Sequence, residues 1–245
     1  MNRTKIDWTD YTWNPITGCL HGCWYCYARK IAIRFPKRFP LGFRPTFHPE
    51  RLHEPEIHKK PSKIFCCSIA DIFAEWTPDE WIDQVLVAME TCPVPHIFQM
   101  LTKNPENIPE DYVFDKRIWV GTTVTGENAP DRDDWKNISE IKKVHAGIRF
   151  VSFEPLLGLL PFNVCLEGID WIIIGKLTGS RRIPLDPNWV NVILWEADDH
   201  NIPIFMKNNL LPDWTGPMRR EWPRLSEEPP IPHPPAKASE RQEAP

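Results

Sequence analysis

Three cysteines lie within eight residues near the amino terminus, in the stretch TWNPITGCLHGCWYCYARK at 12–30. Cys19, Cys23 and Cys26 follow the spacing Cys-x3-Cys-x2-Cys, and Tyr25 directly precedes the third. Thiolates this close together can share a cubane iron–sulfur cluster, in which each of them binds one iron. A 4Fe-4S cluster held by three cysteines leaves its fourth iron open to another ligand, which would explain why three thiols suffice.

Two other kinds of thiol site remain open for this stretch. A zinc ion could take the three cysteines together with His21 or a distant fourth ligand, because Cys3His sites exist. A redox pair of Cys23 and Cys26 would leave Cys19 unexplained.

Four more cysteines bring the total to seven, an odd number at uneven spacing. This favours metal-binding, catalytic or buried thiols over a disulfide framework. Cys66 and Cys67 are adjacent in an apolar run, so a strand there would point them to opposite faces. We interpret both as packing residues, together with Cys92 and Cys165.

Polar side chains follow a series of short apolar runs. In α/β folds the carboxyl ends of parallel strands carry the chemistry, so we expect these side chains to converge on one polar pocket. The candidates at the strand ends are Ser68, Asp71, Lys103, Thr123, Ser152, Glu154 and Lys207.

The apolar runs themselves have the length and composition of buried parallel strands. They lie at 63–69, 96–101, 117–124, 149–155, 170–175 and 202–207, and one more strand is expected just before Cys19. Helical patterns separate them, and strand–helix alternation predicts a parallel sheet. The fold class is therefore α/β, and either a complete or partial (β/α) barrel of about six to seven strands or a doubly wound sheet fits.

Helix signals support this alternation. The segment 77–92 opens with Thr77 as a predicted N-cap, Pro78 in the first turn and Glu80 completing a capping box. The segment 186–201 begins with Asp186 as the cap and a proline next. A third, shorter helix is predicted within 133–146.

The whole chain has 245 residues, a formal net charge of -4 and 42% hydrophobic residues, values typical of a globular protein. It has no apolar run long enough to span a membrane and no signal-peptide pattern, so we expect a cytoplasmic protein without a membrane partner. We expect one domain at 1–212, with an irregular, proline-rich and basic insertion at 35–62. The proline-rich remainder, 213–245, is predicted to be a disordered tail.

The insertion and its flanks, at 29–63, hold ten Lys or Arg against three Glu, with phenylalanines between them. Basic residues interleaved with aromatic ones suit a nucleic-acid strand, so DNA or RNA is one candidate partner. A solvated loop anchored by its phenylalanines is the alternative interpretation.

The Cys-x3-Cys-x-Tyr-Cys pattern resembles the signature of the radical S-adenosylmethionine (SAM) superfamily. Further stretches resemble a phage- and bacteria-associated family of small radical-SAM-like proteins, over about 5–210. These are WTDYTWNPITGC, YCYA, PTFHPERL, SIADIF, LTKNP, RFVSFEPLLG and DWIIIG.

The resemblance implies a parallel β/α barrel with a 4Fe-4S cluster on Cys19, Cys23 and Cys26. The open iron would bind SAM, and one electron from an external reductant would cleave SAM to methionine and a 5'-deoxyadenosyl radical. Tyr25 would flank the adenine, and Ser68 and Asp71 would meet the SAM amino group. Thr123, Ser152 and Glu154 are candidates for the ribose or carboxylate, and Lys103 and Lys207 for a carboxylate or an anionic substrate.

One stretch departs from the pattern of the smaller family. Residues 175–179 read GKLTG where that family carries Gly-Gly-Glu or Gly-Gly-Gln, so Lys176 and Leu177 stand at the expected mouth. The leading hypothesis is a radical SAM enzyme, and the alternative is a non-enzymatic nucleic-acid-binding protein with a structural zinc or iron–sulfur centre. A small-molecule enzyme acting on a phosphate or carboxylate substrate is a third class.

Overall fold

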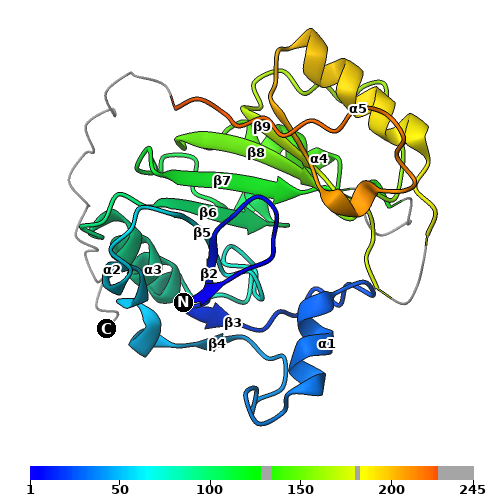
Figure 1. Cartoon of the computed structure of the whole chain (residues 1–245). Coiled ribbons are helices and arrows are strands. Elements are labelled where there is room, and N and C mark those ends of the chain that lie inside the picture. Colours follow the sequence, from blue (N-terminus) through cyan, green and yellow to red (C-terminus); the bar gives the residue numbers. More distant parts are fainter. Residues whose placement is uncertain (128–133, 180–182, 226–245) are drawn as a thin grey trace, which may run out of the picture.

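The structure is a computed structural model, and it describes residues 1–127, 134–179 and 183–225. One eight-stranded sheet dominates it (Figure 1). The strands run in the spatial order β1 (Asn2–Arg3), β2 (Tyr11–Trp13), β5 (Lys63–Cys66), β6 (Ile97–Thr102), β7 (Ile118–Thr123), β8 (Ile148–Phe153), β9 (Trp171–Ile174) and β10 (Ile204–Met206).

Seven of these strands, β2 and β5–β10, pair in parallel, and only β1 is antiparallel to its neighbour. Their spatial order is also their order along the chain. A doubly wound sheet would reverse direction at a switch point, so consecutive order defines a barrel winding. Within the described residues β2 and β10 do not pair with each other, and the barrel is therefore partial. The predicted fold class is confirmed.

Three helices that connect the strands pack outside the sheet. The predicted helices appear as α3 (Asp79–Glu90), α4 (Lys136–Ile141) and α5 (Pro187–Asp199), and residue 133 of the third prediction lies outside the described part. None of the helices in the described segments is long and apolar enough to cross a lipid bilayer.

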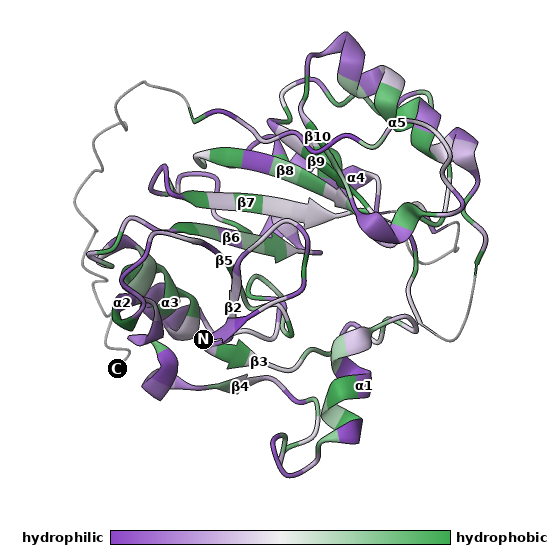
Figure 2. Ribbon diagram, viewed as in Figure 1, coloured by the Kyte–Doolittle hydropathy of each residue, from purple (hydrophilic) through white to green (hydrophobic). Residues whose placement is uncertain are grey.

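A smaller layer lies below the sheet in Figure 1. It contains α1 (Tyr27–Arg34) and the two-stranded sheet of β3 (Ile16–Thr17) and β4 (Thr46–Phe47), while the short α2 (Glu54–Ile57) lies beside α3. Helix α1 stands away from the large sheet, and Figure 2 shows apolar residues among the polar ones along it.

Two apolar cores lie on the two faces of the sheet. The outer core fills the space between strands and helices and includes Phe98, Val120, Ile172 and Ile193. The inner core closes the floor of the barrel with mostly aromatic side chains from alternate strand positions. These are Phe65, Trp119, Ile148, Phe150, Trp171, Ile173 and Phe205, and Trp8 joins them from the segment before β2.

The open side of the barrel is bridged by the N-terminal segment. The Asp7 carboxylate accepts a hydrogen bond from the backbone N–H of Asn208 (2.9 Å) and lies 3.6 Å from the Arg220 guanidinium. Trp8 lies against Phe65 and Trp171 at centroid distances of 4.7 and 6.4 Å. Residues near both ends of the chain thus join where β2 and β10 do not meet.

The prediction that Thr77 caps the helix at 77–92 is wrong. Thr77 Oγ1 donates to the backbone oxygen of Asp71 (3.2 Å), and the helix begins at Asp79 after Pro78, without a side-chain cap. Asp186, in contrast, caps α5 as predicted by accepting from Asn188 N–H (2.9 Å).

Two cysteine predictions are also wrong. Strand β5 ends at Cys66, and Cys67 has a left-handed backbone (φ 57°), so the two sulfurs meet at 3.5 Å instead of facing opposite sides. Cys165 is exposed, not a packing residue. Cys92 is buried as expected.

The segment predicted as a tail is ordered in its first part. Residues 213–225 run along β10, where Met206 N–H donates to Arg219 O (2.9 Å) and Glu221 N–H to Ile204 O (2.8 Å). The boundary at 212 is therefore too early. Residues 226–245 of the predicted tail lie outside the described residues.

Candidate active site

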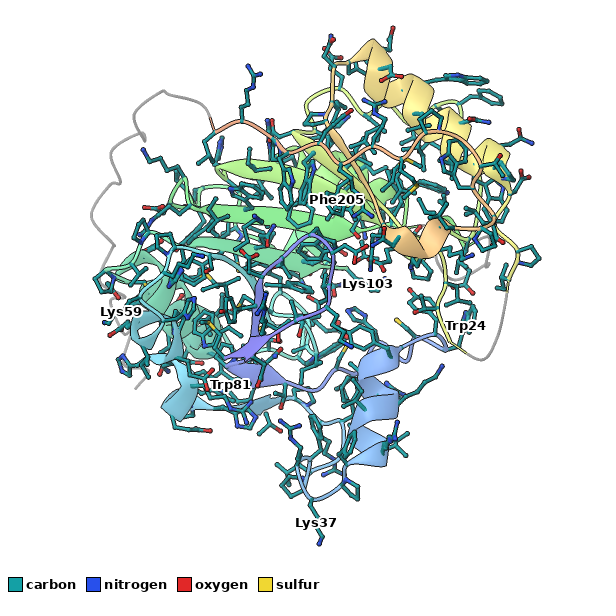
Figure 3. The ribbon with its side chains drawn as sticks, viewed as in Figure 1. Trp24, Lys37, Lys59, Trp81, Lys103 and Phe205 are labelled. Atoms are coloured by element: carbon teal, nitrogen blue, oxygen red, sulfur yellow. The ribbon has the colours of Figure 1, made fainter. Side chains whose placement is uncertain are left out.

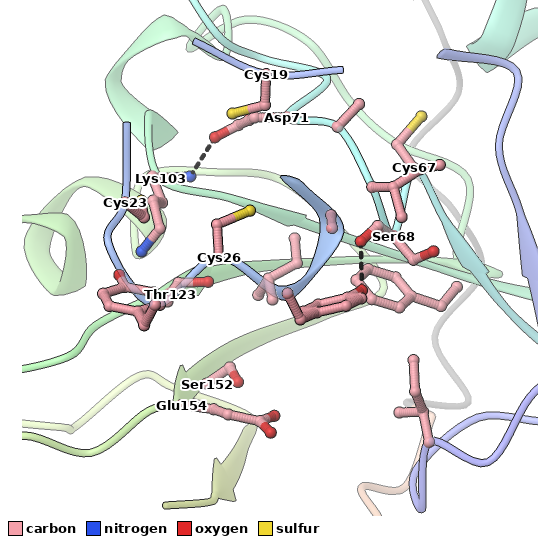
Figure 4. Close-up of a pocket in the computed structure, with 18 of the residues that line it drawn as sticks. Cys19, Cys23, Cys26, Cys67, Ser68, Asp71, Lys103, Thr123, Ser152 and Glu154 are labelled. Atoms are coloured by element: carbon pink, nitrogen blue, oxygen red, sulfur yellow. Dashed lines mark hydrogen bonds between the residues drawn. The ribbon is translucent and has the colours of Figure 1, made fainter. Parts of the chain in front are cut away.

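A cavity of about 560 Å³ opens at the carboxyl ends of the parallel strands. Its walls include every site residue that the sequence suggested (Figure 4). These are Cys19, Cys23, Tyr25, Cys26, Ser68, Asp71, Lys103, Thr123, Ser152, Glu154 and Lys207. These residues converge at one end of the barrel, as expected for the carboxyl ends of parallel strands. The roles of the individual residues remain predictions.

The cysteine loop is positioned by close backbone contacts. Gly18, directly before Cys19, has φ +87°, and a Cβ there would lie 2.1 Å from Arg44 O. Gly18 N–H donates to Ile69 O (3.0 Å), and Cys19 N–H donates to Phe43 O (3.1 Å). Only glycine fits this approach, so Gly18 sets where the first thiol lies.

The third cysteine begins helix α1. Cys26 is its N-cap, and its sulfur accepts a hydrogen bond from Arg29 N–H (3.3 Å). The Arg29 side chain reaches back to Cys19 O (3.4 Å) and lies over the Phe43 ring. The helix start and the loop before it are therefore tied together around the thiols.

A buried carboxylate organises the other side of the loop. Asp71 accepts hydrogen bonds from Thr102 Oγ1 (2.6 Å) and from the backbone N–H of Lys103 (2.9 Å). Its second oxygen also lies 2.8 Å from His21 Nε2, between Cys19 and Cys23 in the chain. Asp71 thus connects two strand ends to the cysteine loop. The sequence suggested His21 only as a zinc ligand and Asp71 as a pocket residue, and no spacing signal indicated that the two side chains contact each other.

The thiols lie close enough to repel one another when ionised. Burial raises the pKa of Cys19 to about 12, and the charges of Asp71, Cys23 and Cys26 add to this increase. A bound cation would offset that repulsion, so metal uptake here is expected to release thiol protons.

The spacing of the thiols bears on which metal group fits. Among the described residues, the three do not form a group whose sulfur atoms all lie within 4.8 Å of one another. A single tetrahedral zinc would bring its thiolates to about 3.8 Å. A cubane cluster binds each thiolate at a different iron, so wider spacing suits it. His21 Nε2 is directed at Asp71, so only its Nδ1 would be left for a metal ion.

The wall opposite the cysteines comes from β7, β8 and β10. Lys207 pairs with Glu154, and both sit above Gly175, where a Cβ would come within 3.0–3.2 Å of them. Ser152 is fully buried, and its hydroxyl has no hydrogen-bond partner among the described residues. A buried polar group without a partner is costly, and here it lines a cavity, so it suits a polar atom of a bound ligand.

Aromatic side chains complete the wall near the cysteines. Lys103 Nζ lies over the Tyr25 ring, 5.6 Å from its centroid. Tyr27 donates its hydroxyl to Ser68 O (2.6 Å). Tyr27 was not among the predicted site residues, although it directly follows the third cysteine.

Lys176, which lies in the GKLTG stretch, has its ammonium group paired with the segment after β10. Its ammonium binds Asp213 Oδ2 (2.8 Å) and Leu211 O (3.1 Å). The segment after β10 therefore accommodates the lysine side chain at this position.

The basic residues of 29–63 divide between two regions. Figure 3 shows Lys37 at the tip of the loop after α1 and Lys59 on another side, near α2. Exposed basic residues on and after α1 are Lys30, Arg34, Lys37, Arg38 and Arg44. Phe43 lines the cavity, and Phe47 stacks on Trp81 (16° between the rings), so these two phenylalanines act as anchors.

The fold and the site together define an α/β protein with a mainly parallel sheet, bent into a partial barrel with a thiol-lined cavity at its carboxyl end. The chain belongs to the family described as "Protein of unknown function (DUF5131)", whose profile matches residues 3–218.

A solved structure is similar over much of the chain: a spore photoproduct lyase complexed with dinucleoside spore photoproduct. The two chains are 11% identical with a TM-score of 0.48, and the match covers 82% of this chain. It spans 64% of that protein's length. The search of curated proteins gave no match.

Proposed function

We propose that this protein is a radical SAM enzyme that holds a 4Fe-4S cluster on Cys19, Cys23 and Cys26. The observation that carries this proposal is that three closely spaced thiols line one cavity together with a buried hydroxyl that has no partner among the described residues. The cluster, with one electron from an external reductant, would cleave bound SAM to methionine and a 5'-deoxyadenosyl radical for hydrogen abstraction.

The residues of the chain would bind and orient SAM in this cavity. Tyr25 would flank the adenine, while Ser152 and Thr123 would meet the ribose or carboxylate. Lys207, already paired with Glu154, would place a positive charge beside an anionic group.

The amino group of SAM was assigned to Ser68 and Asp71. Asp71 already accepts from Thr102 and Lys103 and contacts His21, so we assign it the positioning of the cysteine loop. Lys103 lies against Tyr25 and could complete a site for a carboxylate or an anionic substrate.

The decisive experiment is anaerobic. The protein is reconstituted with iron and sulfide, reduced, mixed with SAM, and analysed for 5'-deoxyadenosine by chromatography and mass spectrometry. We expect product from the unaltered chain and none from Cys23→Ala, whereas Cys92→Ala, which changes a buried cysteine outside the cavity, should retain it.

Two results would contradict the proposal. Uptake of zinc but no cluster at the N-terminal thiols would favour the non-enzymatic binding protein. A cluster that gives equal 5'-deoxyadenosine in the Cys23→Ala variant would mean that the product does not come from this site.

We further propose that the substrate is a nucleic acid held by the basic surface of α1 and its following loop. Five exposed Lys and Arg side chains lie there, and Tyr27, a lining residue of the cavity, is half exposed on the same helix. Phosphates would bind the charges and a base could stack at the mouth.

Binding of a labelled single strand at two salt concentrations tests this surface. Changing Lys30, Arg34, Lys37 and Arg38 to Glu should abolish salt-dependent binding, while Lys59→Glu with Lys60→Glu should have little effect. Equal losses in both variants would contradict a specific role for α1.

A further inference from the structure

Three metal-ligating side chains converge outside the cavity. Cys165 lies in the connection that leads into β9, while Glu196 and His200 are four residues apart at the end of α5. Residues four apart share one helix face. The group lies toward the amino ends of β9 and β10, whereas the cysteine loop lies at the carboxyl ends of the strands.

The three ligand atoms surround a common point. Cys165 Sγ is 3.5 Å from His200 Nε2, which is 3.7 Å from Glu196 Oε2, and all three lie within 4.8 Å of one another. Zinc bonds of about 2.0–2.3 Å in tetrahedral geometry place ligand atoms roughly 3.3–3.8 Å apart. Two of the three spacings, Sγ to Nε2 and Nε2 to Oε2, therefore already fall in the range of a zinc site.

The same geometry argues against a nucleophilic triad. In a triad the acid binds the imidazole nitrogen opposite the nucleophile, where it orients the ring. Here the thiol and the carboxylate both approach Nε2. One nitrogen cannot donate fully to both, but a metal ion between the three atoms would satisfy all of them.

The surroundings suit anionic ligands and a cation. Cys165 Sγ accepts a hydrogen bond from Glu167 N–H (3.3 Å), and Glu196 Oε2 accepts one from Leu166 N–H (3.4 Å). Such outer contacts orient metal ligands. His200 is at the carboxyl terminus of α5, where the helix dipole favours positive charge.

We propose that Cys165, Glu196 and His200 form a zinc site with three protein ligands and one coordination position open to solvent. Binding would release the Cys165 thiol proton to solvent, and His200 would bind as the neutral imidazole. A sulfur, nitrogen and oxygen donor set is typical of zinc. The site does not depend on the proposed radical chemistry.

The test uses the full chain with Cys19, Cys23 and Cys26 changed to Ala, so that the N-terminal thiols cannot bind metal. Cobalt is titrated into the metal-free protein, and the sulfur-to-cobalt charge-transfer absorption is followed. We expect one cobalt per chain, displaced by zinc. Adding Cys165→Ser should abolish the band, and Glu196→Gln or His200→Ala should weaken binding at least about 10-fold.

Two control variants change exposed residues that are not among the three ligands. Glu167→Gln changes a neighbouring exposed carboxylate, and His53→Ala an exposed histidine, and both should bind like the parent. A band that persists with Cys165→Ser, or equal losses in the controls, would overturn the proposal. If the triple-alanine chain does not fold, zinc per chain in the cluster-loaded protein should fall by one with Cys165→Ser, and an unchanged zinc content would overturn it.

Discussion

At the scale of single residues, Asp71 accounts for much of the order around the thiols. It is 5% exposed and contacts three groups from two separate segments: His21 of the cysteine loop, and Thr102 and Lys103 at the end of β6. A buried carboxylate with this many partners fixes their relative positions. The thiols are therefore held partly by a residue that is far from them in sequence.

Asp71→Asn should loosen the cysteine loop. An amide nitrogen cannot accept from Lys103 N–H or Thr102, so at least one buried donor would lose its partner, at about 1–3 kcal/mol of unfolding free energy. We also expect less iron bound per chain after reconstitution. Chemical denaturation measures the unfolding free energy and iron analysis the iron content. The control is Asp83→Asn, which changes an exposed residue of α3. Full iron content in Asp71→Asn would contradict this role.

Ser152→Ala separates binding from folding. Because its hydroxyl has no partner among the described residues, its removal should leave the unfolding free energy unchanged or raise it by up to about 1 kcal/mol. If the hydroxyl binds SAM, the dissociation constant should rise about fivefold. Equilibrium dialysis with labelled SAM measures the dissociation constant, and urea denaturation measures the unfolding free energy. Unchanged SAM affinity would remove Ser152 from the site.

At the scale of elements, the sheet was predictable because its strands are buried on both faces. Strands such as WIII in β9 read as short continuous apolar runs, which are typical of parallel strands covered on both faces. The Asp186 cap was predictable for a similar reason, since it depends on adjacent residues alone. Polar residues after these strands then had to meet at one mouth.

Features set by distant contacts were not predictable. Thr77 has the sequence of a cap, but its hydroxyl binds Asp71 O instead. Cys67 leaves the strand because its backbone turns left-handed, which a pattern of period two does not reveal. Trp8 precedes β2 without any periodic context, yet it fills the barrel floor.

The connection between α2 and β6 should make stability depend on pH. Burial lowers the pKa of His96, whose Nδ1 accepts from Ser62 N–H (3.2 Å) while Nε2 lies 3.0 Å from Pro55 O. This pattern needs the neutral imidazole. Its contribution is therefore complete above pH 6.5, the ordinary value for histidine, and is lost as the pH falls through the lowered pKa.

Urea unfolding measured from pH 7.5 to pH 5 tests this. The unfolding free energy should decrease toward acid, and the decrease should be smaller in His96→Gln. His48, whose pKa burial also lowers, contributes with the same sign, so some slope should remain. Exposed His53→Gln should keep the full slope, and a slope unchanged in His96→Gln would contradict the assignment.

At the scale of the whole molecule, residues 213–225 complete the fold. Trp222 stacks on Trp171 at 5.1 Å and lies under Lys63 Nζ at 4.3 Å, while Glu221 O accepts from Trp171 Nε1 (2.9 Å). Prolines and charges in this segment resemble a disordered tail, but its two tryptophans, Trp214 and Trp222, were a signal for packing.

Two truncations should behave differently. A chain ending after residue 225 should unfold like the full chain, because the proline-rich residues beyond it carry few apolar groups. A chain ending after residue 212 should lose about 3 kcal/mol or more, since it removes two packed tryptophans and uncovers β10. Thermal unfolding and size-exclusion chromatography compare them. Equal stability of both would contradict a structural role for 213–225.

The strand order also determines which contacts can form while the chain is still being synthesised. Each parallel strand pairs with the one synthesised before it, so the sheet can grow during translation. The contact between Asp7 and Asn208, however, joins residues 201 positions apart. The N-terminal segment can make this contact only after almost the entire chain has been synthesised. Until then the aromatic side chains of the barrel floor near Trp8 are exposed to chaperones and to non-native contacts.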